Sequence, residues 1–209
     1  MGIYLNPTID NLKDSLNQES YVDKSKLIGY TNGVIKTEQK YVCVSIPGRF
    51  RKSMIANILS AYYSRKTDEK HLFQDLIISQ NPTFEKHINQ YNVIFLNMQD
   101  FLSQFHDVTQ MRERIEKSVL WDLVNAYPDI PYFDSTDLVR TLMDIYMNTK
   151  IPFIFIIDEW DCIFCEEEYD VHEQRCYMDF LYYLLKDKTY VGLAYMLGVR
   201  TEDDARVFL

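Results

Sequence analysis

The chain has 209 residues, 47% of them hydrophobic and 25% charged, with a formal net charge of -9 at pH 7. This acidic balance argues against a broad nucleic-acid-binding surface, which needs clustered Lys and Arg, and suits an acidic face that docks on a basic protein partner. The longest apolar run, residues 151–157, is too short for a membrane span, and no signal-peptide pattern opens the chain, so we expect a cytoplasmic protein without membrane contact.

In the first third of the chain, the sequence pattern predicts one strand between two helices. Residues 1–20 are polar and are interpreted as irregular, whereas apolar spacing within 21–35 predicts a short helix. The run "KYVCVS" is rich in β-branched and aromatic residues and predicts a strand at 41–45. Apolar residues from Met54 to Tyr62 recur at helical intervals, so a helix of about 12 residues follows that strand.

The middle of the chain predicts a second strand with helices on both sides. Short helical pieces are expected at 73–78 and 84–88. "YNVIFLNM", residues 91–98, predicts the strand, because apolar and β-branched residues dominate it. Residues 108–127 predict a long helix that ends before a proline.

The remaining elements continue the alternation. Residues 134–149 predict a helix opened by the cap candidates Asp134 and Ser135, and "PFIFIID", residues 152–158, predicts a strand buried on both faces. A helix at about 171–187 and a strand at 190–196 follow. Strands alternating with helices indicate an α/β protein with a mainly parallel sheet.

A phosphate-binding loop is indicated between the first strand and its helix. Such a loop reads G-x-x-x-x-G-K-[ST]; backbone N–H groups surround the anion, the lysine contacts the terminal phosphates and the hydroxyl binds magnesium. Lys52 and Ser53 fit the last two positions, whereas Ile46 and Arg51 occupy both glycine positions. The predicted phosphate-contacting residues are Gly48, Arg49, Arg51, Lys52 and Ser53.

Two carboxylates that end the buried strand would complete a nucleotide site. In "FIFIIDEWD", Asp158 would share a magnesium ion with Ser53, and Glu159 would orient the attacking water. If the site is active, Lys52 and Glu159 are the predicted catalytic residues. An apolar strand ending in two acids becomes informative here because it follows a strand, a loop with Lys-Ser and a helix.

Four stretches together resemble the bacterial AAA-ATPase-like family. They are "YVDKSKLI", "KYVCVSIPGRFRKSMIANILSAYYS", "FIFIIDEWDCIF" and "LLKDKTYVGLAYM". The resemblance runs from about residue 3 to 196 and is taken to end after Arg200. It implies a three-layer P-loop NTPase-like fold of the ASCE type, with an N-terminal segment, 1–36, packed on a core domain, 37–209.

The resemblance also implies features that this sequence changes. Family members usually have arginines at the positions of Ile46 and Gly48, a glycine in place of Arg51, and Thr-Gly where this chain has Leu197-Gly198. Their fold has a fifth strand beside the first, so the sheet is expected to be truncated at its C-terminal side. Residues 199–209 would then cover that edge or leave it free to pair with a partner. A nuclease-like domain of the PD-(D/E)XK type usually follows, and we expect none here.

A zinc site is an alternative interpretation of the region after the acidic strand. Cys162, Cys165, His172 and Cys176 have a zinc-knuckle-like order, with the last two one helical turn apart. The family resemblance implies no zinc, and buried cysteines commonly act as small hydrophobic residues. We therefore do not expect zinc.

Two functions from different classes fit these observations. The first is a degenerate domain with weak or absent ATP hydrolysis, because an arginine before Lys52 would spoil the backbone cradle for phosphate. Such a domain would act as an acidic protein-interaction or regulatory module. Its partner would be a nuclease or a defence complex, which the domain would inhibit. The second is an active magnesium-dependent ATPase in which Arg51 is tolerated.

Overall fold

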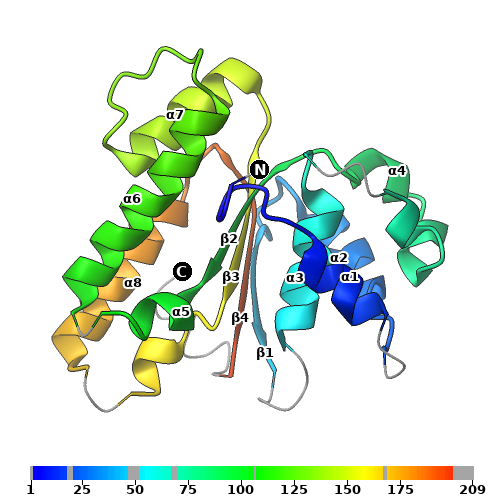
Figure 1. Cartoon of the computed structure of the whole chain (residues 1–209), viewed down its shortest axis with the longest axis horizontal. Helices are drawn as coiled ribbons and strands as arrows, with labels where there is room; N and C mark the ends of the chain where they lie inside the picture. Colours follow the sequence, from blue (N-terminus) through cyan, green and yellow to red (C-terminus); the bar gives the residue numbers. More distant parts are fainter. Residues whose placement is uncertain are drawn as a thin grey trace.

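The computed structural model describes residues 2–17, 21–46, 52–66, 70–105, 107–166 and 169–199. A parallel sheet forms the middle layer, and helices cover both of its faces (Figure 1). Both of these features confirm the predicted α/β architecture, since parallel strands need crossover helices that bury the two faces.

The described sheet has four strands in the order β1-β4-β3-β2, all of them parallel. The strands are β1 (Tyr41–Ser45), β2 (Asn92–Asn97), β3 (Phe153–Asp158) and β4 (Val191–Gly198). β4 lies between β1 and β3, so the strand before the predicted loop and the strand with the acids are not neighbours. This is the arrangement expected for the ASCE type, and the three-layer P-loop NTPase-like fold is confirmed. Residues 200–209, predicted to cover the edge at β1, lie outside the described residues.

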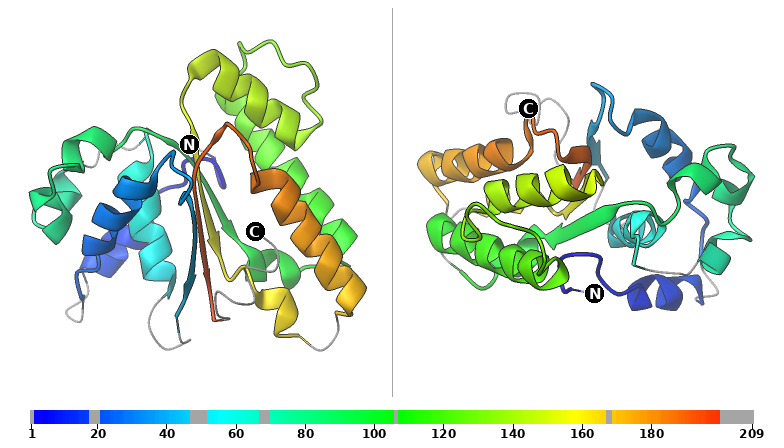
Figure 2. Two further views of the ribbon diagram at one scale, coloured as in Figure 1. Left: turned by 180° about the vertical axis from the view of Figure 1, so that it is seen from behind. Right: turned by 90° about the horizontal axis from the view of Figure 1, so that it is seen from above.

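One face of the sheet is covered by the N-terminal helices and the segment after α3 (Figure 2). These elements are α1 (Asp10–Leu16), α2 (Lys26–Val34), α3 (Lys52–Tyr63), α4 (Phe84–His87) and two 3-10 turns, η1 (Lys70–Phe73) and η2 (Ile77–Gln80). α3 lies against the sheet, and its buried apolar side chains join those of Val93, Ile154 and Leu193 in one core. The 12-residue length of α3 matches the prediction.

The other face is covered by longer helices from the second half of the chain. They are α5 (Met98–Leu102), α6 (Val108–Ala126), α7 (Leu138–Thr149), α8 (Val171–Leu185) and the 3-10 turn η3 (Cys162–Phe164). A second core lies beneath them and includes Ile115, Phe155 and Leu181, all 1% exposed or less. All residues of β3 and β4 are buried, which explains the nearly uninterrupted apolar runs of their sequences.

The N-terminal segment follows the outer edge of β2. Leu5 forms an antiparallel bridge with Ile94, and the carboxylate of Asp122 in α6 accepts hydrogen bonds from the backbone N–H groups of Tyr4 and Leu5. The Asn6 side-chain oxygen accepts a hydrogen bond from the backbone N–H of Val93, at 2.9 Å. The segment therefore occupies part of an edge that would otherwise expose unpaired backbone groups.

Several helical elements differ from the sequence-based prediction, among them α1, α5 and the start of α7. Residues 1–20 are not wholly irregular, because Asp10–Leu16 form α1, whose Leu12 is buried in the core with α3. The short α5 was also not predicted. α7 begins after Asp137, which caps the backbone N–H of Arg140. Asp134 instead closes a local turn by accepting from Thr136, so the predicted cap was wrong by one turn of helix.

Within the described ranges, no helix combines the length and apolar character that crossing a membrane requires.

Candidate functional site

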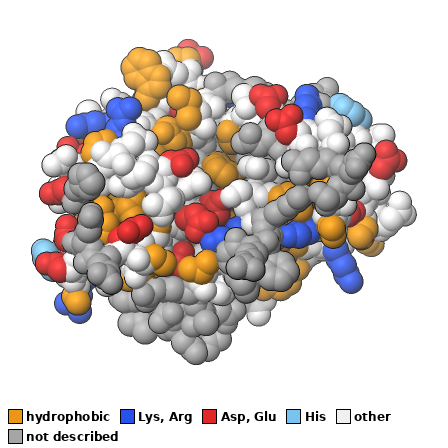
Figure 3. Space-filling view, turned by 60° about the horizontal axis from the view of Figure 1, so that its bottom comes forward, with side chains coloured by type: hydrophobic (Ala, Val, Ile, Leu, Met, Phe, Trp, Pro, Cys, Tyr) orange, Lys and Arg blue, Asp and Glu red, His pale blue; other side chains and the backbone are white. Residues whose placement is uncertain are grey.

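The site lies at the carboxyl ends of the parallel strands, where the chain passes from β1 to α3 and from β3 to η3 (Figure 1). Parallel strands bring these ends to one edge of the sheet, so residues distant in sequence meet there. Figure 3 views the molecule from this end; acidic and basic side chains adjoin in the middle of the face.

Lys52, the first residue of α3, forms an ion pair with Glu159. The Nζ atom of Lys52 lies 2.7 Å from Oε2 of Glu159, and the two side chains are 6% and 31% exposed. Glu159 directly follows β3 and has a left-handed backbone with φ of 53°. A non-glycine residue rarely adopts this conformation, and strain of this kind is often found at functional sites. The turn aims the carboxylate of Glu159 at the start of α3.

Asp158 ends β3 and is fully buried beside Glu159. Burial raises the pKa of the Asp158 carboxyl, and a hydrogen bond from the side chain of Ser53 opposes this rise. Its Oδ1 accepts the backbone N–H of Glu159 at 3.1 Å, whereas its Oδ2 is buried with no hydrogen-bond partner among the described residues. A carboxylate oxygen in this state is costly unless a cation or donor joins it, which makes Asp158 a candidate metal ligand.

The structure thus brings together the four residues selected from the sequence as the centre of the site. Ser53 contacts Asp158, and Lys52 contacts Glu159. Each contact joins the start of α3, the helix that follows β1, to the end of β3. In the sheet, β4 lies between β1 and β3.

The predicted phosphate loop is only partly described. Ile46 continues the pairing of β1 with β4, because its backbone N–H donates to the carbonyl of Gly198 at 2.9 Å. Its side chain packs against the core beneath α3. Gly48, Arg49 and Arg51 lie outside the described residues, so their predicted phosphate contacts remain predictions.

The end of β4 presents an apolar residue to the site. Leu197 pairs with Val44 of β1 and with Asp158 of β3, and its side chain is fully buried. The next residue is Gly198, where an added Cβ atom would lie 2.5 Å from Oδ1 of Asp161. A larger residue at this position would therefore have to displace the buried Asp161 or the neighbouring chain.

Asp161 is a structural member of the site that the sequence reasoning missed. It is fully buried, and its Oδ2 accepts the backbone N–H of Val199 at 2.7 Å. This bond fixes the chain beyond β4 to the turn beyond β3. The only available signal was the third acid in "DEWD", whose spacing from Asp158 does not reveal which chain segment it contacts.

The four zinc candidates do not form one cluster in the described structure. Cys162 is buried in η3, whereas Cys165, His172 and Cys176 are exposed. The Cys176 Sγ atom lies 3.8 Å from Nε2 of His172, as expected for residues one turn apart on α8. No group of three or more His, Cys, Asp or Glu residues suited to a metal occurs within the described residues. The absence of zinc itself stays a prediction.

Comparison with known proteins gives one match. The model of a family described as "Predicted AAA-ATPase", the AAA-ATPase-like family, matches residues 9–204. The match continues past Arg200, where the sequence reasoning had placed its end. Searches of curated proteins and of solved structures found no significant match.

Proposed function

Because this chain belongs to the AAA-ATPase-like family, we propose that it carries a degenerate magnesium–nucleotide site, with weak ATP binding and weak or absent ATP hydrolysis. We further propose that it acts as an acidic protein-interaction or regulatory module. The observation that carries the nucleotide proposal is the convergence of Lys52 and Ser53 with Asp158 and Glu159 at one edge of the sheet.

The residues at this edge fit a hydrated magnesium ion. The Oδ2 atom of Asp158 is a buried carboxylate oxygen without a partner among the described residues, and the Ser53 hydroxyl is adjacent to the same carboxylate. Magnesium prefers oxygen ligands and commonly takes one or two from the protein, with phosphates and water supplying the others. When bound, the ion would neutralise charge on the phosphates. Ser53 and Asp158 would hold it.

Lys52 and Glu159 would then have separate roles. Lys52 supplies a cation at the N-terminus of α3, where backbone N–H groups and the helix dipole also favour an anion. Glu159, released from Lys52, supplies a carboxylate that can orient water. Nucleotide binding therefore exchanges one ion pair for another, and the net gain in binding free energy is smaller than for a lysine that begins unpaired.

Three features support weak or absent hydrolysis. Lys52 is already neutralised by Glu159. The end of β4 offers the buried side chain of Leu197 where related chains are expected to have a polar one. Arg51 stands before the lysine, where a glycine would let the backbone approach phosphate closely. Each feature weakens a contact that the transition state of phosphoryl transfer needs.

The regulatory part of the proposal rests on charge and on family. A net charge of -9 favours electrostatic docking to a basic partner over direct nucleic-acid binding. A nuclease or another component of a defence complex would present such a basic face, and occupation of that face by this domain would inhibit it. Binding to a basic partner should weaken steeply with salt, which distinguishes this docking from an apolar interface.

An active magnesium-dependent ATPase is the second candidate. It is favoured by the same convergence, since Lys52 and Ser53 lie beside Glu159 and Asp158 and all four residue types needed for magnesium-dependent hydrolysis are retained. Calorimetry with magnesium–ATP and a phosphate-release assay distinguish the two. A dissociation constant weaker than about 100 μM, with turnover no faster than that of Glu159→Gln, supports the degenerate domain. Micromolar binding with turnover that depends on Glu159 establishes the ATPase and overturns our proposal.

A further inference from the structure

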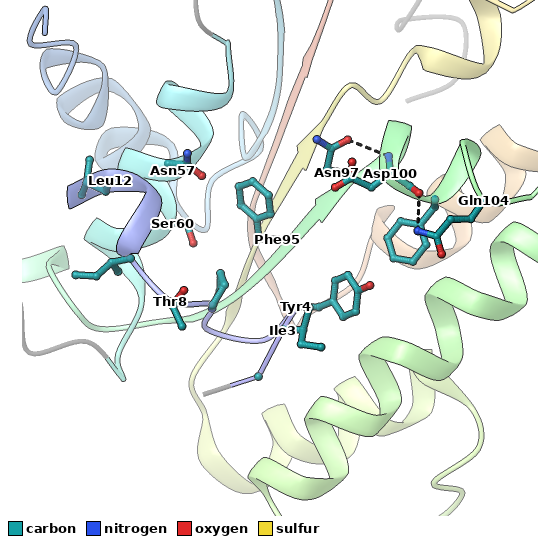
Figure 4. Close-up of a pocket in the computed structure, with 14 residues that line it drawn as sticks. Ile3, Tyr4, Thr8, Leu12, Asn57, Ser60, Phe95, Asn97, Asp100 and Gln104 are labelled. Atoms are coloured by element: carbon teal, nitrogen blue, oxygen red, sulfur yellow. Dashed lines mark hydrogen bonds between the residues drawn. The ribbon is translucent and has the colours of Figure 1, made fainter. Parts of the chain in front are cut away.

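A cavity of about 420 Å³ lies outside the site described above, at the β2 edge of the sheet. It is bounded by α3 on one side, by α5 on the other and by the N-terminal segment, and Figure 4 shows Phe95 between these walls. Its volume falls within the range of small-molecule sites. The phosphate-site residues Lys52, Ser53, Asp158 and Glu159 do not line it.

Aromatic side chains supply the apolar part of this cavity. Phe95 of β2 is only half-buried although it stands in the middle of a strand. The rings of Tyr4 and Phe101 pack against each other with centroids 5.3 Å apart, and both line the cavity. Aromatic faces accept flat rings by stacking and attract cations through the ring quadrupole.

Polar side chains on the α3 side of the cavity are left without partners. Asn57 and Ser60 project from α3, and Thr8 comes from the N-terminal segment (Figure 4). Within the described part of the chain, none of these three side chains takes part in a hydrogen bond. Three hydrogen-bonding groups that converge on a cavity with aromatic walls are the arrangement that orients a ligand in a small-molecule site.

The charge of the cavity is negative. Asp100 of α5 is exposed and lies across the cavity from Asn57 and Ser60 (Figure 4). Its backbone carbonyl is engaged by Gln104, but its carboxylate accepts no hydrogen bond from the other described residues. No Lys, Arg or His is among the described residues that line the cavity. An anionic ligand would therefore meet only repulsion, whereas a cation gains both the carboxylate and the ring faces.

From these four features we propose that the cavity binds a small aromatic amine. Phe95 and Tyr4 take the ring, Asp100 takes the cationic nitrogen, and Asn57, Ser60 and Thr8 take polar substituents of the ring. This site is separate from the proposed nucleotide function and does not depend on it. It gives the domain a means of recognising a small molecule at a place that Lys52, Ser53, Asp158 and Glu159 do not line.

The test compares two indole probes whose side chains carry opposite charges. Calorimetry with tryptamine should give a dissociation constant below about 1 mM, and indole-3-propionate should bind at least about tenfold more weakly. Asp100→Asn removes the charge but keeps the shape, so it should reduce tryptamine affinity about tenfold and, by relieving repulsion, should not weaken binding of the propionate. Phe95→Leu should weaken tryptamine binding through loss of the ring face.

Two further variants keep the result interpretable. Asp14→Asn removes an exposed acid of α1 that does not line the cavity, and it should leave tryptamine binding unchanged. Lys52→Ala should likewise leave it unchanged while reducing nucleotide binding, so failure at one site is not mistaken for failure at the other. Equal binding of the two probes, absence of tryptamine binding, or an equal effect of Asp14→Asn and Asp100→Asn overturns the proposal.

Discussion

The Nζ atom of Lys52 and the Oε2 atom of Glu159 lie 2.7 Å apart, although 107 residues separate the two in sequence. The contact joins the first turn of α3 to the residue after β3. It neutralises Lys52, the only cation within the described part of the proposed phosphate site. An incoming phosphate must therefore compete with a carboxylate of the protein itself.

This competition predicts that Glu159→Gln raises the affinity for ATP. Glutamine keeps the size of the side chain but removes the charge, so Lys52 becomes available to phosphate. We expect affinity for magnesium–ATP to rise about tenfold in calorimetry, equivalent to about 1.4 kcal/mol, and any hydrolysis to fall. The matched control is Glu85→Gln, which disrupts the exposed Lys70–Glu85 ion pair outside the site. It should change neither the affinity for magnesium–ATP nor the rate of hydrolysis. Unchanged affinity in Glu159→Gln would show that the ion pair does not limit binding.

The raised pKa of Asp158 predicts a gain of stability in Asp158→Asn. Folding favours the protonated acid, so the wild-type protein loses stability as pH rises from the unfolded-state pKa of this carboxyl through its folded-state pKa. Asparagine does not ionise. At pH 7 the variant should therefore be more stable by about 1 kcal/mol, with a melting temperature about 2–4 °C higher.

The same variant should lose this advantage at low pH. Below the unfolded-state pKa, both proteins carry a neutral side chain at position 158, and their urea midpoints should converge. Magnesium should stabilise the wild type and not Asp158→Asn. Asp179→Asn, at an exposed position of α8, provides the control. A variant that is less stable than the wild type at pH 7 would contradict the role of Asp158 as a buried, uncompensated acid.

Arg51→Gly tests the altered loop directly. Glycine removes a side chain from the predicted phosphate position and lets backbone N–H groups approach the anion, each charge-assisted hydrogen bond contributing about 1.5–3 kcal/mol. We expect calorimetry to show at least tenfold tighter ATP binding. Hydrolysis should recover less than binding, because Leu197 still offers no polar group. If affinity stays the same, the loop is not the defect that limits the site.

The cysteines are predicted to differ in reactivity. Burial raises the pKa of Cys162 to about 12, so its thiol stays protonated at pH 8, whereas Cys165 and Cys176 are exposed. Alkylation with iodoacetamide, followed by mass spectrometry, should modify the two exposed residues in the folded protein and Cys162 only after unfolding. Elemental analysis should find less than one zinc per chain. One zinc per chain, lost in Cys165→Ser, would contradict this.

The sheet was predictable from the sequence because its strands are buried on both faces and stand out as apolar runs. The positions of all four strands agree with the structure to within two residues at either end. α1 and α5 were not predictable in the same way, since they have only seven and five residues, and helical periodicity is recognised over windows of about 11–18 residues. The start of α7 was misplaced because Asp134 and Asp137 both have the cap chemistry, and only tertiary packing selects between them.

The candidate site was predictable in its members but not in its contacts. The phosphate-loop motif predicted Lys52 and Ser53 as site residues, and the two acids at the end of an apolar strand predicted Asp158 and Glu159. No pattern shows that Lys52 is paired with Glu159 instead of facing outward. The cavity beside Phe95 has no sequence signal either, because its walls come from three segments that only the folded chain brings together.

The pairing of β1 with β4 also sets the order in which this protein can fold. Tyr41 is paired with Ala194, so among the described strands the partner of the strand before the predicted phosphate loop comes about 150 residues later. An intermediate containing β1, α3, β2 and β3 would have a gap where β4 belongs, and β1 would have no neighbour among the described strands. The proposed nucleotide site is consequently among the last features to assemble, and pulse-labelling hydrogen exchange should protect the amides of β1 no earlier than those of β4.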